Sequence, residues 1–358
     1  MGIKSLSKFL RDKWPDLFEL VHISEYHFKK VAIDTSLYLC NFKALYGEEG
    51  WLRAFIKLVA CLRENEIHCV FIYDSGSPPE KDAEKKERAE QRAKMEERTY
   101  RLEQAIDNYH QNGIIEDVLL EFQEKRKIKH ASLLRPGHVS INIGAIEYAV
   151  AKMRKQLFRI TQNDFAVTKQ LFDLLDVPYF DAPLEAETMC ADLCKQGKVD
   201  AVLSEDTDVL AYGAPVFLTK FNTSNGGCYQ IRYDRVLEEL GMTPKQFLDF
   251  CIMCGTDYNK NVAGIGPAGA YKLISAHGTI EDAIKSIDKK KDTTVLNYVR
   301  CRELFKKYPR SNVKVSYCGC PDFNALQQFL FRKNLGMNVE SLKKAFVHNT
   351  VVFQDDED

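Results

Sequence analysis

Short apolar runs that end on a carboxylate residue recur along this chain, and helical patterns separate them. Three such runs, each fitting a buried strand that leads into an acid, are residues 31–34, 69–74 and 201–206. Residues 177–181 fit a further strand, and residues 51–63 and 184–195 have helical spacing. Alternating strands and helices predict an α/β fold with a doubly wound, mainly parallel sheet, in which ligands bind beyond the carboxyl ends of the strands.

Seven carboxylates, referred to below as the seven acids, are expected to converge at that edge: Asp34, Asp74, Glu185, Glu187, Asp206, Asp208 and Asp257. Asp206 and Asp208 lie in a segment expected to be extended, which would point both side chains the same way. Glu185 and Glu187 fall in the first turn of a helix, where the helix dipole tolerates negative charge. Taken singly, a carboxylate at a strand end is more often a helix N-cap or a turn residue, and this alternative stays open for each acid.

So many anions in one place require cations. Oxygen ligands without paired His or Cys select Mg²⁺ or Mn²⁺. A cluster of carboxylates that holds two such metals is suited to in-line displacement at a phosphodiester. The sequence therefore predicts a site for two Mg²⁺ ions, which Mn²⁺ can replace.

The chain changes character after residue 80, where residues 81–98 carry mixed charge with almost no large apolar side chain. Such a run is typical of a solvated helix held by ion pairs between successive turns. Helical patterning resumes near Ile146 after a break at residues 135–137. We interpret residues 81–165 as an insertion into the sheet domain.

A glycine-rich turn follows a helix that begins at Thr243, with Pro244 in its first turn and Gln246 closing a capping box. Residues 264–269 match G-x-G-x-x-G, but no strand precedes them, so a dinucleotide site is not indicated. We favour a tight turn between two helices. The backbone N–H groups of this turn can donate hydrogen bonds to one DNA phosphate.

Composition limits the cellular setting more than the function. The chain has 50 basic and 51 acidic residues, so no global positive field argues for nucleic acid. We find no apolar run long enough for a membrane span and no signal-peptide pattern, and the 11 scattered cysteines are typical of reduced thiols. We expect an intracellular protein with no membrane contact.

Several motifs occur in an order and spacing that are specific as a set: Met1–Lys4, Val31–Asp34, Tyr73–Asp74 followed by Pro78–Pro79, Ala182–Glu187, Glu205–Asp208, Gly255–Tyr258 and Gly264–Pro267. On these residues the chain resembles the structure-specific 5′ nucleases of the flap endonuclease and xeroderma pigmentosum group G family, over nearly its whole length. The resemblance implies a PIN-like nuclease core, and the family's metal ligands carry over onto the seven acids.

The resemblance also implies parts outside the acids. Residues 264–274 look like the family's helix-two-turn-helix, which grips duplex DNA and commonly holds a K⁺ ion. The DNA-binding residues expected with it are Gly2, Gly264, Gly266, Gly269 and Lys272. Lys81 and Arg88 fit the family's catalytic lysine and arginine on the helix of the arch, although two ordinary surface cations in a charged run remain an alternative.

The segments implied are residues 1–80 and 166–240 for the nuclease core, 81–165 for the helical arch, 241–335 for the helix-two-turn-helix region and 336–358 for a tail. Cys40 replaces the family's stacking tyrosine, with Tyr38 and Phe42 as candidate substitutes. The step of 111 residues from Asp74 to Glu185 is long for the family and indicates an elaborated arch. The tail lacks the standard box that binds the sliding clamp, so that contact is not expected. The resemblance also implies a monomer that acts in the nucleus or at the site of DNA replication.

The sequence thus predicts a metal-dependent 5′ nuclease that hydrolyses flap or branched DNA at single-strand/double-strand junctions in replication or repair. In that hypothesis one metal binds Asp34, Asp74 and Glu187, the second binds Asp206 and Asp208, and Glu185 and Asp257 orient nearby waters. A 5′–3′ exonuclease, a junction resolvase or a non-catalytic DNA-binding scaffold are alternatives. A haloacid-dehalogenase-type phosphatase is excluded because its first strand needs D-x-D, where this chain has Asp34-Thr-Ser36.

Overall fold

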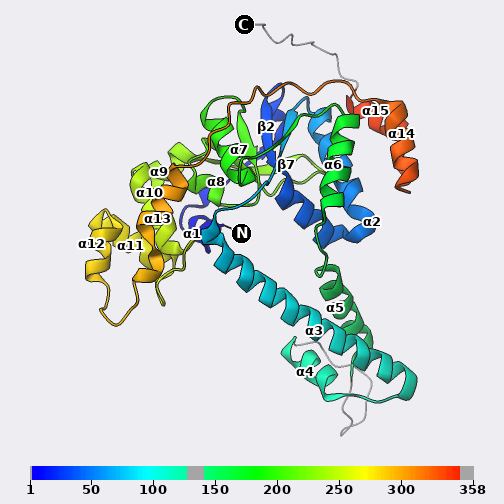
Figure 1. Ribbon diagram of the computed structural model, residues 1–358, viewed down its shortest axis with the longest axis horizontal. Helices are drawn as coiled ribbons and strands as arrows, with labels where there is room; N and C mark the ends of the chain where they lie inside the picture. Colours follow the sequence, from blue (N-terminus) through cyan, green and yellow to red (C-terminus); the bar gives the residue numbers. More distant parts are fainter. Residues whose placement is uncertain (1, 127–140, 347–358) are drawn as a thin grey trace. The chain divides into compact units, whose positions relative to one another are not determined.

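The computed structural model describes residues 2–126 and 141–346 (Figure 1). The chain divides into two compact units. The first, the sheet unit, consists of Met1–Cys40, Leu52–Asp82 and Thr161–Asp358. The second, the helical unit, consists of Asn41–Trp51 and Ala83–Ile160.

A seven-stranded sheet with the order β1-β7-β6-β5-β2-β3-β4 forms the centre of the sheet unit. Its strands are β1 (Glu19–His22), β2 (Lys30–Asp34), β3 (His68–Tyr73), β4 (Tyr179–Asp181), β5 (Ala201–Leu203), β6 (Val216–Thr219) and β7 (Gly227–Arg232). The run from β6 through β5, β2 and β3 to β4 is parallel, whereas β7 pairs antiparallel with both β6 and β1. The mainly parallel sheet expected from the sequence is confirmed.

The two central strands explain why the apolar runs in the sequence are continuous. Strand β3 is buried along its whole length, and β2 is buried from Val31 to Asp34. The two pair in parallel, with Val31 opposite Cys69 and Asp34 opposite Ile72. Strands covered on both faces need apolar side chains at every position. Asp34 and Asp74 at the ends of these two strands therefore depart from the apolar pattern, which indicates a role other than packing.

The α-helices within the described residues are α1 (Leu6–Lys13), α2 (Thr35–Glu64), α3 (Asp82–Asn112), α4 (Asp117–Lys125), α5 (Ile143–Lys155), α6 (Gln162–Leu174), α7 (Ala186–Lys195), α8 (Asp208–Ala211), α9 (Tyr233–Leu240), α10 (Pro244–Cys254), α11 (Pro267–His277), α12 (Ile280–Ala283), α13 (Tyr298–Lys306), α14 (Phe323–Arg332) and α15 (Val339–Phe346). None of them is long and apolar enough to cross a bilayer.

Helix α10 begins as the sequence predicted. The Thr243 hydroxyl accepts from the backbone N–H of Gln246 at 3.3 Å, and the Gln246 side chain accepts from the Thr243 N–H at 2.9 Å. Gly255 ends the helix with φ +95°, a conformation that favours glycine. Helices α10, α11, α12 and α13 pack side by side in the yellow and orange part of Figure 1.

Helix α14 packs mainly against α6 of the sheet unit and against α15. The expected helix-two-turn-helix region, residues 241–335, thus ends in a helix that contacts a different part of the unit. Residues 339–346 of the expected tail form α15. The final residues, 347–358, which carry the prediction of a missing clamp box, lie outside the described residues.

The helical unit has a hydrophobic core of its own. Leu102 and Ile106 of α3, Phe122 of α4, and Ile146 and Val150 of α5 all belong to it. The first turns of α3 are charged and mostly exposed, as the sequence indicated. In α2, residues 41–51 belong to this unit, and Gly47 interrupts the helix there with φ +69° and ψ −172°.

Candidate active site

The elements of the sheet unit bring acids from five segments to the carboxyl edge of the parallel strands. Asp34 ends β2, and Asp74 directly follows β3. Glu185 is the N-cap of α7, and Glu187 lies in the first turn of that helix. The remaining three acids, Asp206, Asp208 and Asp257, follow β5 and α10. The convergence that the strand ends predicted is therefore present.

Backbone N–H groups at the starts of α2 and α7 donate to Asp34 and Asp74. The side chain of Asp34 accepts from the N–H of Leu37 at 3.0 Å and so caps α2. The side chain of Asp74 accepts from the N–H of Ala186 at 2.7 Å, which ties the end of β3 to the first turn of α7. The N-cap role left open for single acids thus applies to Asp34, whose second carboxylate oxygen is not used in the cap.

Six of the seven acids are buried, with Asp208 only 1% exposed. Burial raises the pKa of Asp34, of Glu187 and of Asp208, and neighbouring carboxylates raise the pKa of each further. The pKa of Asp206 is also raised by burial, although the Asp208 N–H opposes this shift. Burial and mutual repulsion thus disfavour the charged form of these carboxyls, and a bound cation would favour it.

Lys81 supplies a positive charge among the acids. Its ammonium lies 2.5 Å from Glu185 Oε1, 3.0 Å from Asp257 Oδ2 and 3.6 Å from Glu187 Oε1. Burial opposes the charge on Lys81, but Glu187, Glu185 and Asp257 outweigh it and raise the pKa of the ammonium above its ordinary value. The structure therefore places Lys81 at the acids.

Tyr258 is a site residue that the sequence reasoning missed. Its hydroxyl lies 2.5 Å from Glu185 Oε2 and 2.6 Å from the hydroxyl of Tyr212, and both rings are buried. Burial raises the pKa of Tyr258, so the neutral phenol donates to the carboxylate. The only signal in the sequence was its position next to Asp257, since the partner Tyr212 is distant along the chain.

The carboxylate of Asp208 is the strongest sign that these residues fit a cation. Both of its oxygens are buried and have no hydrogen-bond partner among the described residues. A buried carboxylate without a partner is costly unless a cation balances it. Within the described residues no group of three His, Cys, Asp or Glu side chains has the spacing that holds a metal ion. The donor chemistry nevertheless fits Mg²⁺ or Mn²⁺, because the acids offer only oxygen ligands.

The expected extended geometry around Asp206 and Asp208 is wrong. Thr207 has helical angles, φ −76° and ψ −8°, and Asp208 begins α8. The Asp208 N–H donates instead to Asp206 Oδ1 at 2.9 Å. Strand β5 has already ended at Leu203, and Thr207 between the two acids is helical. The side chains of Asp206 and Asp208 therefore do not follow the alternation of a strand.

Gly2 lies directly against these two acids. A Cβ on Gly2 would collide with Asp206 Oδ1 and come within 2.9 Å of both the N and Oδ1 atoms of Asp208. Gly2 also has φ +77°, which disfavours other residues. A side chain at position 2 would thus collide with the acids, which explains the glycine. The DNA contact that the sequence suggested for Gly2 stays a prediction.

Arg88 belongs to the helical unit, where its Nε forms an ion pair with Glu84 one turn earlier on α3. The described contacts of Arg88 therefore agree with the solvated helix that the charged run indicated. The catalytic role suggested for Arg88 stays a prediction.

The glycine turn before α11 has the open backbone that the sequence suggested. Gly264 has φ +75°, and a Cβ on Gly266 would meet nothing within 4 Å. Gly264, Gly266 and Lys272 are exposed, and Gly266 is the N-cap of α11. Gly269 packs more closely, with its Cβ position 3.3 Å from the Ile265 side chain.

Neither candidate replacement for the stacking tyrosine is exposed. Tyr38 is 6% exposed and Phe42 is 9% exposed, and Cys40 between them is half-buried. Tyr46, on the same helix, is 55% exposed and lies 6.1 Å from the Phe42 ring. An aromatic residue able to stack on a base is thus available at Tyr46, which the sequence reasoning did not select.

Comparisons with known proteins agree with this fold and site. Models of the XPG N-terminal domain and the XPG I-region match residues 1–95 and 176–257. A probable RAD2-like endonuclease 369L of Invertebrate iridescent virus 6 is 31% identical over 97% of this chain and 92% of its own. Flap endonuclease 1 of Aedes aegypti is 30% identical over 92% of this chain and 82% of its own. The solved structure of flap endonuclease-1 from Methanococcus jannaschii superposes with a TM-score of 0.61, at 25% identity over 93% of this chain and 96% of that chain.

A parallel sheet with clustered acids at its carboxyl edge, followed by a glycine turn between helices, defines a nuclease of the PIN-like class. Within that class, the chain belongs to the flap endonuclease and xeroderma pigmentosum group G family of structure-specific 5′ nucleases. Members of this family are metal-dependent phosphodiester hydrolases.

Proposed function

We propose that this protein cuts 5′ flaps and related branched DNA at single-strand/double-strand junctions, using two divalent cations held by the seven acids. The observation that carries the proposal is the buried carboxylate of Asp208, which has no hydrogen-bond partner among the described residues. It lies in a cluster of acids with which Lys81 already forms ion pairs. A nuclease of this family needs such a cluster to bind cations next to the phosphate.

Mg²⁺ fits the oxygen donors, and Mn²⁺ fits them as well. In the proposal Asp34, Asp74 and Glu187 hold one ion and Asp206 and Asp208 the other, while Glu185 and Asp257 orient waters. When bound, the cations supply Lewis-acid stabilisation of the charge that develops on the scissile phosphate.

The protein's own groups contribute positioning and charge. The Tyr258 hydroxyl holds Glu185 in place through the 2.5 Å hydrogen bond. The Lys81 ammonium balances the charge of Glu185 and Asp257 when no divalent cation is bound. With cations bound to the acids, the same ammonium would be available to contact the scissile phosphate. Arg88 is proposed to assist from α3, a second cation spaced seven residues from Lys81.

The duplex arm of the substrate is proposed to dock on the turn before α11. The exposed backbone of Gly264 and Gly266 allows a phosphate to approach the start of the helix, with Gly269 and Lys272 on the following turns. A K⁺ ion is proposed at this turn. Gly2 is proposed to keep space open beside Asp206. The protein would act as a monomer, without the sliding clamp, where DNA is replicated or repaired.

Cleavage mapping on a 5′-labelled flap, a nicked duplex and a four-way junction tests the proposal. We expect a single product released from the base of the flap in Mg²⁺. Asp206→Ala should abolish this product while leaving flap binding intact, because removing an anion near a phosphate does not weaken docking. A ladder of short products would indicate an exonuclease, and symmetric cuts in the junction a resolvase. Retained turnover by the variant would contradict the proposed metal site.

The contribution of Lys81 and Arg88 is tested separately. Lys81→Ala and Arg88→Ala should each reduce the single-turnover rate by about 10² at saturating enzyme, because both stabilise charge formed in the transition state. Lys94→Ala is the control, since Lys94 is an exposed lysine on α3, the helix that carries Arg88 and begins directly after Lys81. Equal rates for Arg88→Ala and the control would leave Arg88 as an ordinary surface cation.

A further inference from the structure

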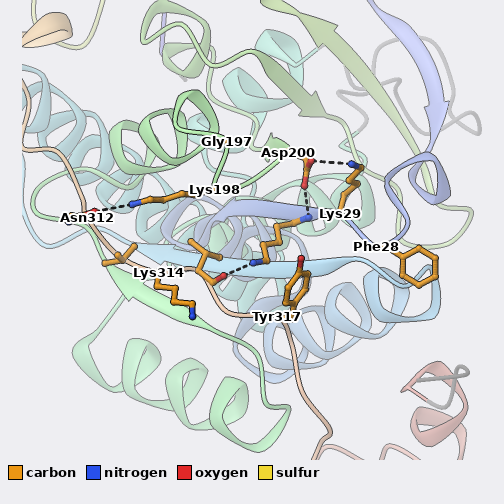
Figure 2. A pocket seen from close by; sticks show the side chains of 11 residues that line it. Phe28, Lys29, Gly197, Lys198, Asp200, Asn312, Lys314 and Tyr317 are labelled. Atoms are coloured by element: carbon orange, nitrogen blue, oxygen red, sulfur yellow. Dashed lines mark hydrogen bonds and ion pairs between the residues drawn. The ribbon is translucent and has the colours of Figure 1, made fainter. Parts of the chain in front are cut away.

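A pocket of about 550 Å³ lies at the amino-terminal ends of the parallel strands, the edge of the sheet opposite the seven acids. Lys30 at the start of β2, residues 197–200 before β5 and the extended segment 312–317 form its walls (Figure 2). Its volume falls in the range of about 300–1,000 Å³ that is usual for small-ligand sites. All of these residues belong to the sheet unit.

The lining of the pocket is strongly basic. It contains Lys29, Lys30, Lys198 and Lys314 but only one carboxylate, Asp200. The Lys29 ammonium pairs with Asp200 at 3.5 Å, so the lining as a whole keeps a net positive charge. In a protein with a formal charge of −1, this is a local concentration of positive charge.

Helix dipoles do not account for all of these lysines. Lys198 follows the carboxyl end of α7, where a cation is favourable. Lys29 directly precedes β2, Lys30 is the first residue of that strand, and Lys314 lies eight residues after the end of α13. An anionic ligand could therefore bind beside these ammonium groups.

The walls are held in place before any ligand arrives. The Lys30 ammonium donates to the carbonyl of Val315 at 2.6 Å and lies 3.8 Å from the centre of the Tyr317 ring. The Lys30 N–H donates to Asp200 Oδ2 at 2.9 Å, and Lys198 donates to the Asn312 side chain at 3.3 Å. These bonds join three distant parts of the chain, so the pocket is largely preformed.

An exposed aromatic ring stands at one end of this basic lining. Figure 2 shows Phe28 at the opposite end of the pocket from Lys198, Asn312 and Lys314. Phe28 is 39% exposed and has φ +61°, a left-handed conformation that is costly for a bulky residue. Its N–H donates to the carbonyl of Glu66 at 2.9 Å and so holds that conformation. Backbone strain of this kind is concentrated at functional sites.

We propose that this pocket binds a short single strand of DNA, with phosphates on Lys198 and Lys314 and a base against Phe28. Lysines and an exposed aromatic ring along one groove are the combination that holds a single strand without reading its sequence, through charge and stacking together. Because Figure 2 places Phe28 and these two lysines at opposite ends of the pocket, more than one nucleotide is needed to contact both. This second site lies outside the proposed catalytic machinery and does not depend on it.

A tryptophan placed in the pocket gives a local test. Phe28→Trp should show saturable fluorescence quenching by a short oligothymidylate in a chelator, because a base stacks on the new ring. Inorganic phosphate should compete without quenching, since it fills only the lysine end. Thymidine monophosphate serves as the second probe: it cannot occupy both ends at once, so we expect much weaker quenching, and equal quenching would contradict a strand that spans the pocket.

Charge reversal supplies the control. Lys198→Glu with Lys314→Glu should weaken oligothymidylate binding at least about tenfold and reduce its dependence on salt. Lys333→Glu with Lys344→Glu makes the same change of charge at two exposed lysines, the C-cap of α14 and a residue of α15, and should have no effect. Calorimetric titration of the oligothymidylate into the chain with Phe28 intact repeats the comparison without the reporter. Absence of saturable binding, or equal affinity in both double variants, would overturn the proposal.

Discussion

The ammonium of Lys81 lies 2.5 Å from Glu185 Oε1, so a residue just before α3 forms an ion pair with the N-cap of α7. The same ammonium also reaches Asp257 and Glu187. Without divalent ions, Lys81 is thus a counter-ion for buried acids that come from separate segments of the chain. Its loss should affect stability as well as turnover.

Lys81→Met should lower the unfolding temperature of the protein in a chelator, because breaking a buried ion pair commonly costs about 3–5 kcal/mol. Adding Mg²⁺ should restore most of this loss, since cations then balance the same acids. Thermal unfolding with and without Mg²⁺ measures both effects. Lys285→Met is the control, because the exposed Lys285 pairs with Asp282 of α12, which is not one of the seven acids. A variant as stable as the parent in chelator would show that Lys81 is not needed as a counter-ion.

Asp208→Asn should remove most of the stabilisation that Mg²⁺ gives the parent protein. Binding to the folded state alone raises stability in proportion to the logarithm of ligand concentration over Kd. Because both oxygens of Asp208 are buried without partners among the residues that the structure describes, a cation is the expected source of their compensation. The shift in unfolding temperature across a Mg²⁺ series is the measurement, and an unchanged shift would exclude Asp208 as a ligand.

Gly2→Ala should reduce cleavage by about 10², the size of loss that a misplacement of roughly 1 Å in an active site can cause. The new methyl group would push against Asp206 and Asp208. Gly241→Ala is a matched control, because Gly241 also has a positive φ, +62°, but its Cβ would meet nothing within 4 Å. Both variants bear the backbone strain, so only Gly2→Ala should lose activity beyond any loss of stability.

Gly266→Val should weaken binding to a plain duplex about tenfold while leaving the unfolding temperature nearly unchanged, because blocking the approach of a phosphate removes a helix N-terminal contact. The protein itself has room for the side chain, since a Cβ there meets nothing within 4 Å and the φ of −92° suits any residue. Affinity for a duplex without a flap, measured by fluorescence anisotropy, gives the result. Equal affinity of variant and parent would remove this turn from the DNA-binding surface.

Glu281→Gln should change the acid stability of the α10 to α13 region. A hydrogen bond from Arg302 lowers the pKa of Glu281 from 4.5 to about 2, and Arg302 also binds the buried Asp249 at 2.6 Å. A carboxyl whose pKa is depressed by folding contributes stability above its unfolded pKa and loses it as pH falls through the folded value.

The parent should therefore lose more stability than Glu281→Gln between pH 4.5 and about 2. Unfolding temperatures measured across that range check the sign. Glu124→Gln, at an exposed position of α4, should follow the parent. If the parent and Glu281→Gln fall in parallel, the pair with Arg302 does not contribute to folding.

The fold class was accessible from the sequence because its signals are local. Continuous apolar runs, the capping box of Thr243 and Gln246, and glycine at the end of α10 each depend on a few neighbouring residues. The convergence of the acids also followed, since the ends of parallel strands meet at one edge. The roles of those acids as ligands remain predictions.

Features that depend on packing between distant segments were not accessible. The hydrogen bond from Tyr258 to Glu185 joins residues 73 positions apart, and the basic pocket joins Lys30 to Val315 across 285. The helical start at Asp208 was missed because the turn after β5 is set by the sheet. Likewise, no local pattern assigns residues 41–51 to the helical unit, because α2 continues on both sides of them.

The separate hydrophobic core of the helical unit has a consequence for how such a protein can change. Only four chain crossings connect this unit to the one that carries the strands. Residues can be gained or lost in its loops while the strand ends that present the acids keep their geometry. The helical unit can thus diverge at a different pace from the part of the chain that carries the acids.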